Sequence, residues 1–318
     1  MLSLTMKKII IILSLLASFA MFSCKQKEPN IYIVGFIDDN AVYWLNGELS
    51  ILPKSGEKAI ATSAAVSGSN VYIAGFDGDN AVYWQNGERK ALSSQDKSRA
   101  TSIAVSGSNV YIVGWSFNES QRYAVYWLNG EQTVLSKSNQ SAAYSIAVSG
   151  SNVYIAGYDG DDAVYWLNGE KTVLPKTGDE AMAYSISISG NNVCIAGWDV
   201  NNAVYWLNGE RKVLPKSGDI AETVSIFASG ANIYITGSDG QLGKWTAVYW
   251  QNGNQKILLT PDKFAGTTSI AVSGNNIYVA GWNYNGSEQD AIYWLNGKRI
   301  ILPKSGVTAS ASAIVVVR

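Results

Sequence analysis

The sequence predicts an all-β protein, a seven-bladed β-propeller of four-stranded antiparallel blades, from three observations. A unit of about 40 residues recurs seven times, and each copy holds four short strand-like runs between turn signals. The one strand missing at the start of the array reappears at its end. Together these observations predict a ring closed by the C-terminal strand, which joins the first blade.

The repeat is marked by Ala-Val-Tyr-Trp, followed one residue later by Asn-Gly, with Ile in place of Val once. Successive tryptophans of this phrase are 39 to 44 residues apart, a spacing shared by propeller blades and some helical arrays. The seven tryptophans are Trp44, Trp84, Trp127, Trp166, Trp206, Trp250 and Trp294.

Turn chemistry decides between the two architectures. Within one unit the strand-like runs, named a to d, are 101–105, 110–113, 124–128 and 132–135. Ser-Gly-x-Asn separates a from b, and Asn-Gly separates c from d, where it suits a type I′ turn between antiparallel strands. Turn signals every ten or so residues are incompatible with helical repeats, so we expect four-stranded blades.

The ends of the array predict how the ring closes. The first unit begins with its strand b at 31–34, and the chain ends with a surplus strand a at 311–317. From each c–d glycine to the next a–b glycine there are 20 or 21 residues, and counting 21 from Gly297 reaches Arg318. We therefore expect 311–317 to pair with 31–34, which leaves no open inner edge.

Composition along a blade agrees with this arrangement. Strand a is rich in Ser and Ala, as expected where seven strands converge on one axis, and aromatic residues concentrate in strands b and c. We therefore interpret the seven Tyr-Trp pairs as core residues between blades.

The first residues resemble a bacterial lipoprotein signal. Lys7 and Lys8 precede an uncharged apolar run, which ends at a lipobox-like Met-Phe-Ser-Cys whose cysteine is Cys24. The alternative is a plain secretory signal. We expect a signal peptide over 1–23, a lipidated Cys24 with a short tether over 24–30, and the propeller over 31–318. This predicts a bacterial cell-envelope protein, outer-membrane, periplasmic or surface-facing, that contacts the membrane through its anchor only.

Composition excludes several functions. With 24 Lys and Arg against 25 Asp and Glu, the chain lacks the basic surplus of a nucleic-acid binder. It contains no histidine, which removes Ser-His-Asp and Cys-His catalysis and histidine-held metals. Cys194 stands where the other repeats have Tyr, so we interpret it as a packing residue. We expect no cofactor and a monomer.

The phrase Ala-Val-Tyr-Trp-x-Asn-Gly-Glu, with Leu a few residues on, resembles the extracellular HAF repeats of bacterial proteins. Those repeats carry His-Ala-Phe-x-Trp, then Gly, then a Leu-rich segment, and the histidine that names them is missing here. The resemblance spans 31–318 and implies an exported repeat propeller without an assigned activity.

The b–c connections hold the candidate site. Between the strand-b Gly and the next Ala they have five residues in four blades and nine in three, whereas the a–b and c–d turns are nearly uniform. Extra length on a rigid frame commonly carries binding residues, although surface loops also lengthen at little cost. The predicted site residues are Trp115, Phe117, Arg122, Tyr123, Lys244, Trp245, Trp282, Tyr284 and Asp290.

Two other repeated features have alternative interpretations. Asp77-Gly78-Asp79-Asn80 and the related turn at 159–162 present carboxylates that suit either Ca²⁺ or a plain turn. A lysine follows strand d in five blades and forms either a solvated rim or a ring that meets anionic partners.

These observations predict a non-catalytic propeller that binds a protein or a glycan on its b–c face. An envelope-assembly scaffold is one alternative, and a carboxylate-based glycan-active enzyme is another.

Overall fold

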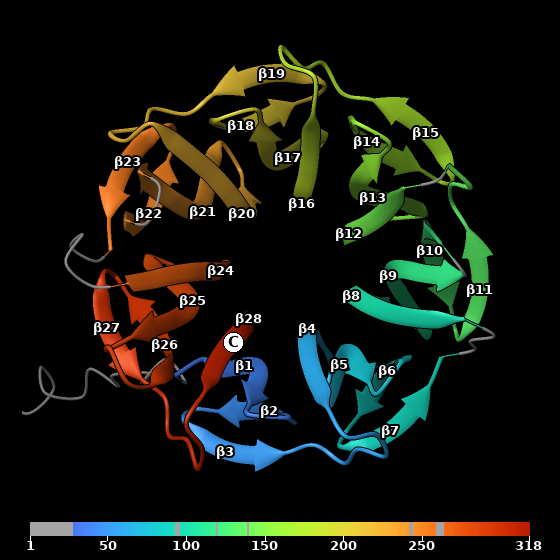
Figure 1. The fold of residues 1–318 in the computed structure, drawn as a ribbon, viewed down its shortest axis with the longest axis vertical. Helices are drawn as coiled ribbons and strands as arrows, with labels where there is room; N and C mark the ends of the chain where they lie inside the picture. Colours follow the sequence, from blue (N-terminus) through green and yellow to red (C-terminus); the bar gives the residue numbers. More distant parts are fainter. Residues whose placement is uncertain (1–27, 93–95, 119, 139, 242–243, 259–263) are drawn as a thin grey trace, which may run out of the picture. The chain divides into compact units, whose positions relative to one another are not determined.

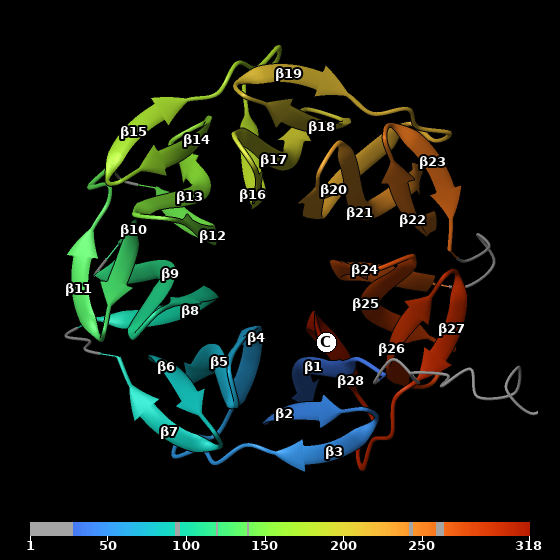
Figure 2. The same ribbon diagram turned by 180° about the vertical axis from the view of Figure 1, so that it is seen from behind.

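The computed structural model describes residues 28–92, 96–118, 120–138, 140–241, 244–258 and 264–318. Residues from Asn30 to Val317 form one compact unit, a ring of seven four-stranded antiparallel sheets around a central axis (Figures 1 and 2). The described residues contain no helix long and apolar enough to cross a membrane. The predicted signal peptide and Cys24 lie outside the described residues.

Each blade runs from strand a at the axis to strand d at the rim. The a strands are β4 (Ala59–Ser67), β8 (Lys97–Ser106), β12 (Ser141–Ser149), β16 (Ala181–Ser189), β20 (Ile220–Ser229), β24 (Phe264–Ser273) and β28 (Ala309–Val317). The b strands are β1 (Asn30–Ile37), β5 (Asn70–Asp77), β9 (Asn109–Asn118), β13 (Asn152–Asp159), β17 (Asn192–Asp199), β21 (Asn232–Gln241) and β25 (Asn276–Tyr284). The c strands are β2 (Asn40–Leu45), β6 (Asn80–Gln85), β10 (Gln121–Leu128), β14 (Asp162–Leu167), β18 (Asn202–Leu207), β22 (Lys244–Gln251) and β26 (Gln289–Leu295). The d strands are β3 (Glu48–Ile51), β7 (Glu88–Ala91), β11 (Glu131–Val134), β15 (Glu170–Val173), β19 (Glu210–Val213), β23 (Asn254–Ile257) and β27 (Lys298–Ile301).

The predicted ring closure is confirmed. The first blade has the order β28-β1-β2-β3, so its inner strand comes from the far end of the chain. β28 pairs antiparallel with β1 from Asn30↔Val317 to Ile37↔Ala309, next to each other in Figure 1. We number this blade 1 and the others 2 to 7 along the chain.

The a–b and c–d turns form a uniform face because one asparagine pair recurs in every blade. In blade 1, Asn46 Oδ1 accepts a hydrogen bond from Ile31 N at 2.9 Å, and its Nδ2 donates to Asn30 Oδ1 at 3.0 Å. The Asn of each c–d turn has φ between 51° and 53°, and the following Gly has φ between 82° and 92°, as a type I′ turn requires. The Asn-Gly repeats are therefore structural.

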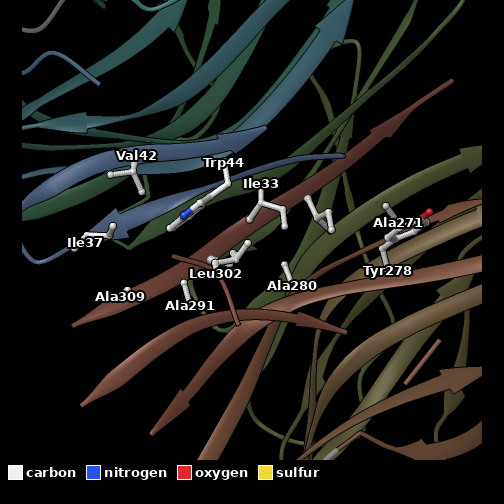
Figure 3. Packing of buried hydrophobic residues seen from close by; sticks show 12 residues of the cluster. Ile33, Ile37, Val42, Trp44, Ala271, Tyr278, Ala280, Ala291, Leu302 and Ala309 are labelled. Atoms are coloured by element: carbon white, nitrogen blue, oxygen red, sulfur yellow. The ribbon is translucent and has the colours of Figure 1, made fainter. Parts of the chain in front are cut away.

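The core lies between adjacent blades. Trp44, fully buried, packs with Ile33 and Val42 of its own blade and with Tyr278 and Ala291 of blade 7 (Figure 3). All seven repeat tryptophans are completely buried, which agrees with their interpretation as core residues. In four blades the indole Nε1 also donates to a proline carbonyl of the preceding blade; the donors are Trp44, Trp84, Trp206 and Trp250.

Every inner strand carries a bulge that turns one residue toward the axis. In blade 3 the register of β8 against β9 shifts between Ala100 and Ser102, so Thr101 has no partner. The bulge requires glycine on strand b, since a Cβ on Gly114 would lie 1.9 Å from the carbonyl oxygen of Arg99. The seven bulge residues are Thr62, Thr101, Tyr144, Tyr184, Val224, Thr268 and Ser312.

Candidate functional site

The three long b–c connections are extended hairpins rather than loops. In blade 3, β9 and β10 remain paired as far as Asn118↔Gln121, and blade 6 shows the same extension to Gln241↔Lys244. There the four additional residues add two to each strand, which keeps the alternation of faces intact. In blade 7 the pairing ends one step earlier, at Tyr284↔Gln289. The predicted site residues therefore lie on paired strands of the b–c face.

The bulge residues surround a cavity of about 410 Å³ on the central axis. The threonines in this ring are structural, because their hydroxyls bond to backbone: Thr62 Oγ1 donates to Ala100 O at 2.9 Å and Thr101 Oγ1 to Ala143 O at 2.7 Å, each in the next blade. Two positions break the run of small residues, Tyr144 and Tyr184. The side chains of strand a are therefore not all small. A bulge residue can be large because it enters the cavity rather than the crowded space between strands.

A second asymmetry is the carboxylate of Glu222, which lines the same cavity. It lies two residues before the bulge residue Val224. Tyr144 and Tyr184 are in ring contact, with centroids 5.5 Å apart and planes tilted by 49°. The cavity wall thus combines two phenol rings with one acidic group, and neither feature was anticipated from the sequence.

From Tyr144 a series of stacked side chains continues outward to blade 2. Tyr144 stacks on Tyr158 at 5.7 Å, and the guanidinium of Arg122 lies 5.4 Å from the Tyr158 ring centroid and 5.8 Å from that of Trp115. Arg99 lies 5.8 Å from the same Trp115 ring and 4.1 Å from Phe76. We call this series the stacked arc; its members are Phe76, Arg99, Trp115, Arg122, Tyr158, Tyr144 and Tyr184.

Beside the arc, a cavity of about 330 Å³ opens between blades 3 and 4. Three cationic side chains line it, together with two aromatic rings and an amide; the lining residues are Lys97, Arg99, Arg122, Trp115, Phe117 and Gln140. We call it the cationic cavity. Among the described residues, the only carboxylate paired with these cations is that of Asp79, 3.1 Å from Lys97 and 3.8 Å from Arg99.

Arg122 is the cation without a counter-ion. Among the described residues, no carboxylate lies within ion-pair distance of it. Its Nε is buried and has no hydrogen-bond partner among the described residues. A buried polar group without a partner costs about 1–3 kcal/mol, and a carboxylate of a ligand beside the guanidinium would offset part of that cost.

Burial governs the electrostatics of the arc. Burial, aided by Tyr158, raises the pKa of Tyr144 to about 12, although the charge of Arg122 opposes the shift. Burial, then Tyr144 and Glu222, raise the pKa of Tyr184 as well, and burial alone raises the pKa of Glu222. Burial lowers the pKa of Arg99, while Asp79 opposes this shift.

The structure brings three of the nine predicted site residues together, Trp115, Phe117 and Arg122. Tyr123 of the same hairpin points elsewhere; its hydroxyl donates to Asp96, and it lines a separate cavity of about 310 Å³. Of the three long hairpins, the blade 3 hairpin is therefore the one whose predicted residues line a shared cavity.

The remaining predicted residues lie on blades 6 and 7. Asp290 is ion-paired with Lys304 at 2.8 Å, and the Tyr284 hydroxyl donates to Gly286 O at 2.9 Å. Trp282 stacks on Phe264 at 6.4 Å. Trp245 and Lys244 lie on β22, which extends the b–c hairpin of blade 6.

The acidic turns and the repeated lysines stabilise the connections between blades. The buried carboxylate of Asp77 accepts hydrogen bonds from Ser55 N and Gly56 N, each at 2.7 Å, and from Arg89 Nε. Lys54 Nζ donates to two backbone carbonyls, of Asp39 and Glu57. Lys176, Lys216 and Lys304 likewise each bond to two backbone carbonyls. These contacts favour the plain-turn interpretation over Ca²⁺, and structural tethers over a free lysine ring.

The fold and the cavities define a seven-bladed β-propeller with an asymmetric b–c mouth. No protein-family model matches the chain, and no curated protein matches it. Among solved structures it is similar to an acylaminoacyl peptidase of Pyrococcus horikoshii, with 13% identity, a TM-score of 0.54 and coverage of 87% of this chain and 51% of the peptidase. The chain thus spans about half the length of that enzyme.

Two further similarities are weaker. A computationally designed protein, Ika8, has 17% identity, a TM-score of 0.49 and 90% coverage of each chain. A structure of the nidogen–laminin complex has 14% identity and a TM-score of 0.45, covering 68% of this chain and 88% of the other. At 13% identity, the similarity to the peptidase shows the fold alone.

Proposed function

We propose that the protein is a binding module that takes an acidic glycan into the cationic cavity of blades 3 and 4. One observation carries the proposal: Arg122, held between the Trp115 and Tyr158 rings, has no counter-ion among the described residues. A carboxylate of the ligand would pair with this guanidinium at low solvent exposure, where such a bond is strongest.

Three further features favour a sugar over other anions. The cavity, at about 330 Å³, is within the range of small-ligand sites. Phe117 at its edge is 37% exposed and offers a flat apolar face on which a sugar ring can stack. Lys97 and Gln140 supply hydrogen-bonding groups for hydroxyls.

The proposal includes the location predicted from the sequence. A lipid on Cys24 would hold the propeller at a bacterial envelope, where acidic polysaccharides are available. Incorporation of a labelled fatty acid into the protein in cells, compared with a Cys24→Ser variant, tests the anchor independently of ligand binding.

Calorimetric titration with a trigalacturonate tests the binding site, with its neutral methyl ester as the matched control. We expect the acid to bind, the ester to bind at least about tenfold more weakly, and added salt to weaken the acid's binding. Arg122→Gln should also weaken binding about tenfold or more, a loss of roughly 1.4 kcal/mol. Lys137→Gln removes a positive charge from the same face outside the cationic cavity and should leave binding unchanged.

Equal binding of acid and ester, or full binding by Arg122→Gln, would contradict the proposal. A glutamate-rich peptide that binds more tightly than the sugar and depends on Arg122 would instead indicate a protein partner.

A further inference from the structure

The central cavity has a chemistry opposite to that of the cationic cavity. Its one charged lining group among the described residues is Glu222 on β20. The corresponding position of the other inner strands, two residues before the bulge, carries no acid; those residues are Ile60, Arg99, Ala142, Met182, Gly266 and Ser310. The repeat scaffold therefore does not require a carboxylate here.

Glu222 has no cationic partner within ion-pair distance among the described residues. The threonine hydroxyls beside it are committed to backbone carbonyls, as Thr268 Oγ1 is to Ala311 O at 2.7 Å. A half-buried carboxylate without a counter-ion is costly to maintain, so a cationic ligand would stabilise it.

Tyr144 and Tyr184 complete the site. Both line the cavity, and their rings are in contact, with centroids 5.5 Å apart and planes tilted by 49°. Aromatic rings attract cations, most strongly where water is excluded, and aromatic-lined cavities suit alkylammonium groups. A divalent metal ion would need about six oxygen ligands, and a single carboxylate cannot supply them.

We propose that the central cavity binds an organic ammonium group, with Glu222 as its counter-ion and Tyr144 and Tyr184 as its aromatic walls. At about 410 Å³ the cavity accommodates a quaternary ammonium headgroup. The site uses none of the residues that line the cationic cavity. The ammonium proposal can therefore be tested, and can fail, independently of the glycan proposal.

Calorimetric titration of the full chain with choline tests this site. The control ligand is 3,3-dimethylbutan-1-ol, which has the same shape without the charge. We expect choline to bind at least about tenfold more tightly than the neutral alcohol. Glu222→Gln, which keeps the side-chain volume, and Tyr184→Leu, which removes one wall, should each weaken choline binding by about tenfold.

Glu57→Gln is the matched control, because it removes an exposed carboxylate of a d–a connection and should leave choline binding unchanged. Thermal unfolding of each variant shows whether the fold is retained. Equal affinity for choline and the alcohol would overturn the proposal, as would full choline binding by a folded Glu222→Gln protein.

Discussion

The seven repeat tryptophans share one sequence motif but differ in whether the indole N–H donates a hydrogen bond. Trp206 Nε1 donates to Pro175 O at 2.8 Å, whereas Trp166 Nε1, equally buried, has no hydrogen-bond partner. The difference arises one blade earlier, where Leu174 is followed by Pro175 but Leu135 is followed by Ser136. Two identical repeat phrases therefore contribute unequally to stability.

This inequality predicts that Trp206→Phe destabilises the protein more than Trp166→Phe. Both substitutions remove a similar buried volume, but only the first breaks a hydrogen bond and leaves a carbonyl without its donor. The expected difference in the free energy of unfolding is about 1 kcal/mol. Denaturant unfolding midpoints of the two variants measure it, and equal midpoints would mean that the indole–proline bond adds nothing.

Residue identity also explains what the sequence could and could not reveal about the site. Aligning the seven repeats at one column gives Thr62, Thr101, Tyr144, Tyr184, Val224, Thr268 and Ser312, so the two tyrosines stand out once that column is compared. That this column faces the axis follows only from the bulge. The bulge depends on strand register and was not predictable from composition.

At the scale of elements, three d–a connections depend on one carboxylate each. Asp77, Asp199 and Asp239 lie on b strands and accept hydrogen bonds from a Ser or Thr and a Gly of the preceding connection. Burial would raise the pKa of each, but these bonds outweigh it, and the pKa of each is lowered.

A lowered pKa in the folded state fixes the sign of the pH dependence. These carboxylates contribute full stability above the ordinary aspartate pKa of about 4, and the contribution is lost as pH falls through the lower folded value. Thermal unfolding midpoints should therefore fall as pH decreases below about 4. Asp77→Asn should lower the midpoint at pH 7 and reduce its dependence on acid; an unchanged acid profile would show that Asp77 is not responsible.

The hairpin extensions show the limit of pattern reading for elements. Their extra length was evident in the sequence, but their strand character was not, since Phe117 is followed by a polar stretch without alternation. Pairing continues because four added residues divide evenly between two strands and preserve which side each residue faces. The same even division places Arg122 against Tyr158 of the neighbouring blade.

For the whole molecule, counting residues between turns was sufficient to predict the closed ring. The predicted pairing of the C-terminal strand with the first blade rests on an integer match of repeat lengths, and the structure confirms it. The mouth of the ring was less predictable, because the stacked arc combines residues of blades 2 to 5 that come together only when successive blades pack.

Closure through β28 predicts that a circular permutant will fold. Val317 and Asn30 are paired in the register that Ser67 and Asn70 have in blade 2, where two residues join them. A chain of residues 309–317, Gly-Ser and 30–308 should therefore keep its circular dichroism spectrum and unfold within a few degrees of the parent. Deleting 309–318 is the contrasting variant and should prevent cooperative unfolding; a permutant that fails to fold would contradict this topology.

Strand β28 also sets the order of events at the ribosome. A nascent chain emerges from its N-terminus, so β1 leaves the exit tunnel first and waits for a partner that is translated last. Until then the inner edge of β1 is unpaired and the ring is open, even if the other six blades have already folded. Closure of the ring therefore waits until β28, the last strand of the seven blades, has been made.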